Sequence, residues 1–145
     1  DWSWSRGLGD VYKRQVKAVG KVLPELLGKL SGSAIRVPTP NVSMAILNLR
    51  LKQETNAEEL NEFIRTQAVH SPLRKQIDFI NSAEAVSTDF VGSRHACVFD
   101  AQATKVDGKN AVLYIWYDNE FGYTCQVHRV LEQMAGVKYE LYPKD

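Results

Sequence analysis

The chain has 145 residues, of which 44% are hydrophobic and 24% are charged, and its formal net charge is +1. This length suits one globular domain with a buried core, and a net charge so close to zero excludes a long-range field that would hold nucleic acid or an anionic membrane. No apolar run approaches the roughly 20 residues needed to cross a bilayer, and the first residues lack the apolar core of a signal peptide, so we expect a soluble protein that binds no membrane.

The first fifteen residues show no regular pattern. Gly7-Leu8-Gly9 resembles the start of a dinucleotide-binding glycine loop, but no strand precedes it and Tyr12 stands where a third glycine is needed. We therefore expect residues 1–15 to be a disordered or non-native tract, and the folded domain to span residues 16–145.

An amphipathic helix is predicted from residue 16. Its apolar side contains Val16, Val19, Leu23, Leu26 and Leu27. Pro24 is expected to bend or shorten this helix, and Gly28 is expected to end it.

A short strand is predicted over residues 34–37, and the prolines of Pro38-Thr39-Pro40 hold the backbone extended after it. Arg36 is then fixed at a strand end. Its planar guanidinium suits a phosphate, although the residues alone favour an ion pair with a carboxylate.

The next strand alternates between two faces. Apolar side chains occupy one face, at Ala45, Leu47, Leu49 and Leu51, and Asn48 and Arg50 occupy the other. Thr55 to Glu58 has the form of a capping box, and the apolar spacing after it predicts a helix on the sheet that ends at Ser71-Pro72.

Short strands are predicted at residues 77–80, 96–99 and 101–106. Asp107-Gly108 is typical of a hairpin turn that leads into an antiparallel strand, Ala111–Tyr117. Asp118 can cap a helix that continues to Met134 and stops at Gly136. The pattern predicts an α+β fold, with a mixed, largely antiparallel sheet and helices packed on one face, which leaves the other face for a partner.

The three histidines have no carboxylate or thiol partner at local spacing, so we interpret His70, His95 and His128 as structural or solvated. Cys97 and Cys125 lack the spacing of a zinc site or a disulfide framework, which predicts no metal and favours a reducing cytoplasm. Asn119 and Tyr123 are four residues apart and can meet one ligand together, although spacing alone favours capping and packing.

Several motifs carry a family resemblance. They are Trp116–Tyr123, Ala18–Leu26 with Gly28–Leu30, Arg36–Ser43, and Val86–Phe90 followed by Phe99–Ala101. In this order they resemble the C-terminal catalytic domain of phosphorylating glyceraldehyde-3-phosphate dehydrogenases, over nearly everything from Lys17 to Met134.

The resemblance implies that glyceraldehyde 3-phosphate is oxidised and phosphorylated to 1,3-bisphosphoglycerate with NAD or NADP, in a cytoplasmic homotetramer. It implies that Arg36 contacts the substrate phosphate or inorganic phosphate, that Asn119 binds the nicotinamide carboxamide, and that Tyr123 forms a wall beside it. The family's catalytic cysteine, its histidine base and its nucleotide-binding half precede the matched stretch. We therefore assign no catalytic residue to this chain and expect it to be inactive alone.

Two alternatives remain open. One is an erythrose-4-phosphate dehydrogenase domain, although Tyr117, Tyr123 and Pro40 are more typical of the glyceraldehyde enzymes. The other is a non-catalytic oligomerisation module that pairs through its sheet face.

Overall fold

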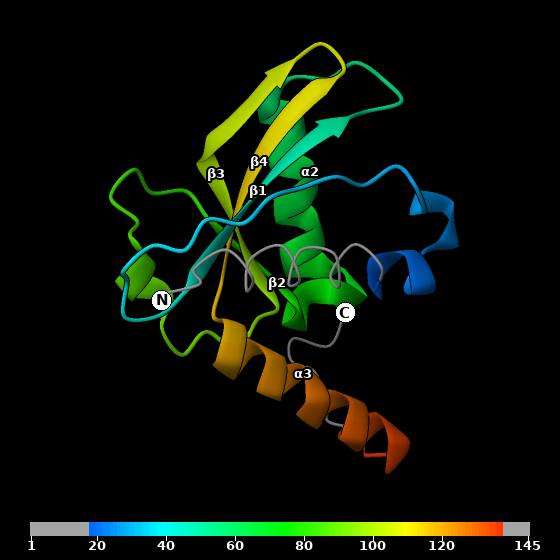
Figure 1. The fold of residues 1–145 in the computed structure, drawn as a ribbon, viewed down its shortest axis with the longest axis vertical. Coiled ribbons are helices and arrows are strands. Elements are labelled where there is room, and N and C mark those ends of the chain that lie inside the picture. Colours follow the sequence, from blue (N-terminus) through cyan, green and yellow to red (C-terminus); the bar gives the residue numbers. More distant parts are fainter. Residues whose placement is uncertain (1–17, 138–145) are drawn as a thin grey trace, which may run out of the picture. The chain divides into compact units, whose positions relative to one another are not determined.

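The computed structural model describes residues 18–137, which are drawn in colour in Figure 1. The chain divides into two compact units between Pro38 and Thr39, and each unit is described by itself. The predictions for residues 1–15 and for a domain start at residue 16 lie outside the described residues.

The first unit contains a helix at residues 18–22, followed by the 3-10 turn η1 (Pro24–Leu26). Pro24 occupies the first position of η1, so the predicted shortening of the helix is confirmed. Gly28 follows with a φ of +76°, a left-handed value that favours glycine.

The predicted strand at residues 34–37 is wrong. The segment is not assigned to a strand, and Ile35 is 86% exposed. A strand needs a hydrogen-bonded neighbour, and the two prolines that follow can donate no backbone hydrogen bond. Arg36 therefore does not stand at the end of a strand.

The second unit is built on a four-stranded sheet with the order β1-β4-β3-β2. The strands are β1 (Ser43–Arg50), β2 (Ile77–Ile80), β3 (Cys97–Asp107) and β4 (Asn110–Tyr117). Strand β4 is antiparallel to β1 and β3, while β2 is parallel to β3. The prediction of a mixed, largely antiparallel sheet in an α+β fold is confirmed.

Strand β3 differs from the prediction in its continuity. The expected strands at 96–99 and 101–106 form one element, whose register with β4 shifts between Asp100 and Lys105. Asp107 pairs with Asn110, so the two-residue turn is Gly108-Lys109, one residue later than predicted. Gly108 has a φ of +58°, which explains glycine at the first turn position.

Helix α2 (Ala57–His70) begins one residue later than the predicted capping box implies. The Glu59 backbone N–H donates to Asn56 Oδ1 over 2.9 Å, so Asn56 and not Thr55 is the N-cap. The Thr55 hydroxyl lies close enough, at 2.9 Å, to donate to the Glu59 carboxylate. Ser71 caps the other end, and Pro72 starts the 3-10 turn η2 (Pro72–Lys75).

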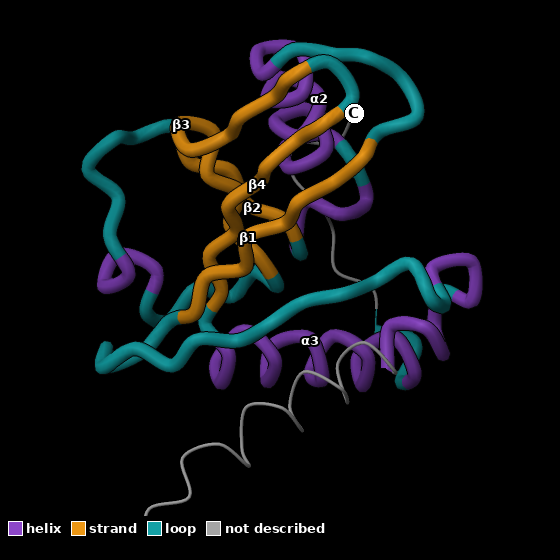
Figure 2. The backbone as a smooth tube through the Cα atoms, turned by 45° about the horizontal axis from the view of Figure 1, so that its top comes forward, coloured by secondary structure: helices purple, strands orange, loops and turns teal. Residues whose placement is uncertain are grey.

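The main core lies between the sheet and α2, which covers one sheet face (Figure 2). Its buried members are Phe99, Ala101, Ala111 and Leu113, and Leu60 and Ile64 of α2 pack against them. Leu47 stands opposite Leu113, so the predicted apolar face of β1 points to this side. Leu47 is nevertheless 38% exposed because β1 is an edge strand.

A smaller core lies on the opposite sheet face, under the 3-10 turn η3 (Ser87–Phe90). Its buried residues are Val42, Phe90 and Val98, and the Phe90 ring stacks on Trp116 with centroids 5.2 Å apart. This face, predicted to be left for a partner, is therefore partly covered by the chain itself.

Helix α3 (Asn119–Met134) follows directly after β4 and runs away from the end of the sheet (Figure 1). Asp118 is its N-cap, and Gly136 follows with a φ of +70°, so both predicted boundaries are confirmed. Four apolar residues of α3 have the spacing of one helical face, which would suit packing, but they are 41–80% exposed: Val127, Val130, Leu131 and Met134. None of the helices in the described residues is long and apolar enough to span a membrane.

Candidate cofactor and phosphate site

The corner between β4 and α3 is organised by the Asp118 carboxylate, which is only 2% exposed. Its Oδ1 accepts hydrogen bonds from the backbone N–H groups of Glu120, at 3.2 Å, and Phe121, at 3.0 Å. Its Oδ2 accepts from the Gly92 backbone N–H, at 2.9 Å, and from the Asn41 side-chain amide, at 3.1 Å. One side chain thus joins three separate segments of the second unit.

These contacts set the charge of the corner. The Gly92 N–H lowers the pKa of Asp118 most, and the Phe121 N–H and the Asn41 amide lower it further, against the effect of desolvation. The carboxylate is therefore ionised at neutral pH. Its negative charge lies at the positive end of the α3 dipole, where it is stabilising.

Asn119 and Tyr123, the predicted cofactor-binding residues, lie on the first turns of α3. Both are exposed, Tyr123 by 70% of its surface, and among the described residues neither side chain has a hydrogen-bond partner. The alternative that Asn119 caps the helix is wrong, because Asp118 does so, and a tyrosine this exposed has little packing role. The structure leaves both side chains available to a ligand on one face of the helix.

The first turn of α3 is held against a loop by a close backbone approach. A Cβ built on Gly122 would lie 2.9 Å from the carbonyl oxygen of His95, so this position has room only for glycine. Further along α3, the side chains of Gln126 and Arg129 donate to the Arg94 carbonyl, at 3.3 and 3.2 Å. The direction of α3 is thereby set by the loop that precedes β3.

Arg36, the predicted phosphate-binding residue, belongs to the first unit and is exposed. No carboxylate among the described residues pairs with it, so the alternative of a structural ion pair gains no support there. The structure places Asn119 and Tyr123 on one helix. The joint site with Arg36 stays a prediction.

Of the two histidines with a carboxylate partner, only His128 contradicts the prediction that no such partner lies at local spacing. His128 Nε2 lies 3.0 Å from Glu132 Oε1, a partner four residues later on the same helix that local spacing should have identified. His95 Nδ1 lies 3.5 Å from Asp78 Oδ2, a partner distant in sequence. The parallel pairing of β2 with β3 brings these two residues together, so no local signal could have predicted the contact.

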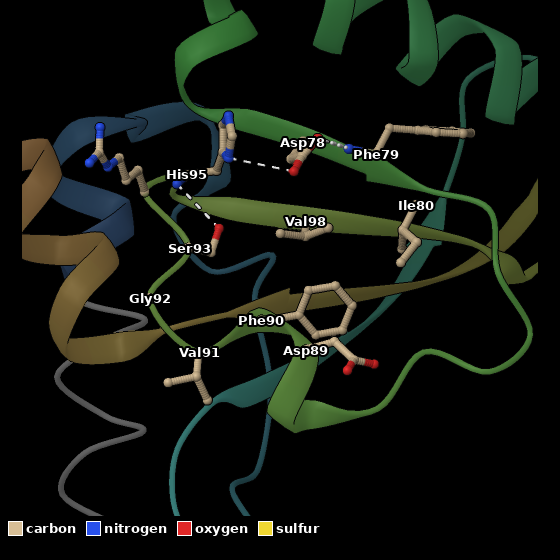
Figure 3. Close-up of a pocket in the computed structure, with 11 residues that line it drawn as sticks. Asp78, Phe79, Ile80, Asp89, Phe90, Val91, Gly92, Ser93, His95 and Val98 are labelled. Carbon is tan, nitrogen blue, oxygen red and sulfur yellow. Dashed lines mark hydrogen bonds and ion pairs between the residues drawn. The ribbon is translucent and has the colours of Figure 1, made fainter.

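The His95–Asp78 pair lies at the edge of an open hollow of about 560 Å³ (Figure 3). Its apolar lining includes Phe79, Ile80, Phe90 and Val98, from β2, η3 and β3. Burial raises the pKa of the nearby Cys97 thiol, and the Asp78 charge raises it further, which makes this thiol a poor nucleophile. No cluster of three or more His, Cys, Asp or Glu residues that could hold a metal ion occurs within residues 18–137.

Comparison with known proteins gives one consistent result. The family described as "Glyceraldehyde 3-phosphate dehydrogenase, C-terminal domain" matches residues 13–119. A "Glyceraldehyde-3-phosphate dehydrogenase-like protein" of Pseudomonas aeruginosa is 64% identical over 88% of this chain and 28% of its own length.

Two further relatives bear the plain enzyme name. "Glyceraldehyde-3-phosphate dehydrogenase" of Glossina morsitans morsitans is 46% identical over 81% of this chain and 35% of its own length. "Glyceraldehyde-3-phosphate dehydrogenase 1" of Saccharomyces cerevisiae is 42% identical over 82% of this chain and 36% of its own length. The chain thus spans about a third of the length of the relatives that it matches.

Proposed function

Because the chain belongs to the glyceraldehyde 3-phosphate dehydrogenase family, as a representative of its C-terminal domain, we propose that it forms the cofactor-facing and phosphate-binding part of a phosphorylating aldehyde dehydrogenase. The substrates are glyceraldehyde 3-phosphate and inorganic phosphate, the cofactor is NAD or NADP, and the complete enzyme is a cytoplasmic homotetramer. The observation that supports this most is the exposed Asn119 side chain, which has no hydrogen-bond partner within residues 18–137 and directly follows the buried cap Asp118.

Each assigned residue has a binding role. The Asn119 amide carries a donor and an acceptor, which match the carbonyl and amide of a nicotinamide carboxamide and so select one orientation of the ring. Tyr123, one helical turn later, gives a flat apolar wall with a polar tip beside that ring. Arg36 offers several charge-assisted donors to a phosphate and keeps its charge at neutral pH.

The bound dinucleotide supplies the hydride acceptor for aldehyde oxidation. We assign no nucleophile or base to the described residues, since the Cys97 thiol is held protonated and no histidine there makes a hydrogen bond to Cys97 or Cys125. The chain alone should therefore turn over no substrate. An assay of NAD reduction with aldehyde and phosphate, combined with gel filtration, tests this directly, and measurable turnover by the chain would contradict it.

The site assignment can be tested in a complete enzyme. We suggest a chimera in which this chain replaces the matching part of the Pseudomonas aeruginosa relative. Arg36→Ala should raise the KM for phosphate on the order of tenfold or more, as expected for a lost charge-assisted contact, and should leave the KM for NAD nearly unchanged. An equal rise in the KM for phosphate and the KM for NAD would count against the phosphate role of Arg36. Arg65→Ala, an exposed arginine on α2 that pairs with Glu62, is the matched control.

Asn119→Ala in the same chimera should show the opposite pattern. The KM for NAD should rise on the order of tenfold, because one or two hydrogen bonds to the carboxamide are lost, while the KM for phosphate stays close to its original value. Comparing glyceraldehyde 3-phosphate with erythrose 4-phosphate as substrates tests the alternative aldehyde.

A second candidate function is a non-catalytic oligomerisation module. The pairing surface predicted for it was the sheet face, which the chain partly covers. The exposed apolar side chains of α3 favour pairing through this helix instead, since Met134 is 80% and Leu131 is 57% exposed. Stable oligomers of the chain on gel filtration, without turnover, would favour this module. A monomer would exclude self-association as its function.

A further inference from the structure

The two oxygens of Asp118 serve different parts of the second unit. Oδ1 faces the first turn of α3, where it accepts from Glu120 and Phe121. Oδ2 faces away from the helix and accepts from Gly92, in the loop after η3, and from Asn41, at the entry to β1. The carboxylate therefore has a helix side and a loop side.

Helix capping explains only the first side. An N-cap needs one oxygen acceptor for the free N–H groups of the first turn, and Asn, Ser and Asp supply it about equally well. The second oxygen meets two donors, a backbone N–H and an amide NH₂, and a carboxylate is the side chain that accepts from both sides at once. The helix dipole favours a negative charge at this position, but a cap alone gives no role to the second oxygen.

The Asn41 end of this network contains a strained residue. Val42 has a φ of +72°, a left-handed value that is an outlier for a β-branched side chain. The Val42 N–H donates to Asn41 Oδ1 over 2.8 Å, while the other end of the same amide donates to Asp118. Such backbone strain persists where the surrounding contacts enforce it, and it is typical of sites whose geometry matters.

We infer that Asp118 is a positioning residue, which through Asn41 and Gly92 fixes the start of α3 so that the adjacent Asn119 side chain is presented to the nicotinamide. This inference rests on the proposed function, because it takes Asn119 as the group that contacts the cofactor. It adds that the entry of β1 and the loop after η3, distant from each other in sequence, hold that contact in place.

Four substitutions in the chimera separate positioning from capping. Asp118→Asn and Asp118→Ser keep an oxygen for the helix but remove the second acceptor, and the asparagine NH₂ would face two donors. Asp118→Ala removes both functions. Asn41→Asp combined with Asp118→Asn restores one hydrogen bond in reversed polarity and serves as the rescue variant.

We expect Asp118→Asn and Asp118→Ser to raise the KM for NAD on the order of tenfold, similar to Asp118→Ala, and the double variant to recover part of that loss. If capping alone matters, Asp118→Asn and Asp118→Ser will match the original protein and only Asp118→Ala will be impaired, which would overturn the inference. Thermal unfolding of each variant shows whether it is folded. If Asp118→Asn does not fold, Asn41→Leu carries the same expectation, since it removes the amide donor to Asp118 together with the acceptor of the Val42 N–H.

The Asn119→Ala variant separates the cofactor-binding role of Asn119 from the positioning role of Asp118. If Asn119→Ala raises the KM for NAD and the Asp118 variants do not, the positioning role fails and the cofactor role stands. If Asn119→Ala has no effect, the cofactor role fails, and the positioning role that rests on it fails with it.

Discussion

Among single residues, Asp118 matters most for the corner before α3, because its buried carboxylate is held by hydrogen bonds on both oxygens. Burying an unpaired carboxylate would lower the free energy of unfolding by roughly several kcal/mol, but Asp118 accepts four hydrogen bonds. Three of them come from backbone N–H groups, whose positions depend on the path of the chain and not on side-chain identity. Small changes at this residue should therefore have measurable effects.

The first residue-scale prediction concerns pH. The folded pKa of Asp118 lies below its ordinary value near 3.8. A lowered pKa means that the charged form stabilises the fold above the unfolded-state pKa, and that this stabilisation is lost as the pH falls through the folded pKa. The difference in unfolding free energy between the original chain and Asp118→Asn should shrink from neutral pH to about pH 3. Urea unfolding at both pH values measures it, and a difference that grows in acid would contradict the assignment.

The second residue-scale prediction concerns Gly122. Gly122→Ala would place a Cβ 2.9 Å from the His95 carbonyl oxygen, a backbone atom that can move only with its loop. We expect a loss of about 1–3 kcal/mol in unfolding free energy, the usual cost of overpacking, although alanine favours helices elsewhere. Urea denaturation of the chain measures the loss. Gln133→Ala, at an exposed position of α3, should change stability little, and equal effects of the two would argue against the close approach.

At the scale of elements, the caps decide where helices begin. Two residues compete to start α2, since both Thr55 and Asn56 can act as caps. In the structure Asn56 is the cap, and Glu59 joins both candidates. The Glu59 backbone N–H donates to the Asn56 side chain, and the Glu59 carboxylate accepts a hydrogen bond from the Thr55 hydroxyl.

Replacing this cap gives the element-scale prediction. Asn56→Ala should lower the unfolding free energy by about 1 kcal/mol, because the Glu59 N–H loses its acceptor. Asn56→Asp keeps the oxygen acceptor and adds charge at the helix N-terminus, so it should preserve stability. Urea denaturation followed by circular dichroism compares them. If Thr55→Val proves more harmful than Asn56→Ala, the cap assignment is wrong.

At the scale of the whole molecule, buried and exposed apolar residues divide sharply between the sheet and α3. Phe99 is 2% exposed and stacks on Phe79 with ring centroids 5.8 Å apart, under helix α2. Leu131 and Met134 of α3 are mostly exposed, although their helical spacing is that of a packed face. The stability of the described second unit should therefore come from the sheet and α2.

This division gives a whole-molecule prediction. In the chain alone, Phe99→Ala should lower the unfolding free energy by about 3–5 kcal/mol through loss of buried contacts and formation of a cavity. Leu131→Ala should change it by less than about 0.5 kcal/mol, since most of its surface is already in water. Chemical denaturation of both variants checks the contrast. A large loss of unfolding free energy for Leu131→Ala would show that the apolar side of α3 is covered in solution, as pairing of two copies through this helix would require.

Elements with local sequence signals could be predicted without the structure. Alternating apolar residues predicted β1, Asp118 and Gly136 marked the ends of α3, and several motifs, including the one around Asn119, carried the family resemblance. Tertiary structure alone decided the pairing of Asp118 with Asn41 and Gly92, and of His95 with Asp78, because sheet pairing and loop packing join residues far apart in the chain. It also decided that the segment around Arg36 forms no strand and that the apolar side of α3 is exposed, since helical spacing shows which residues share a face but not what covers it.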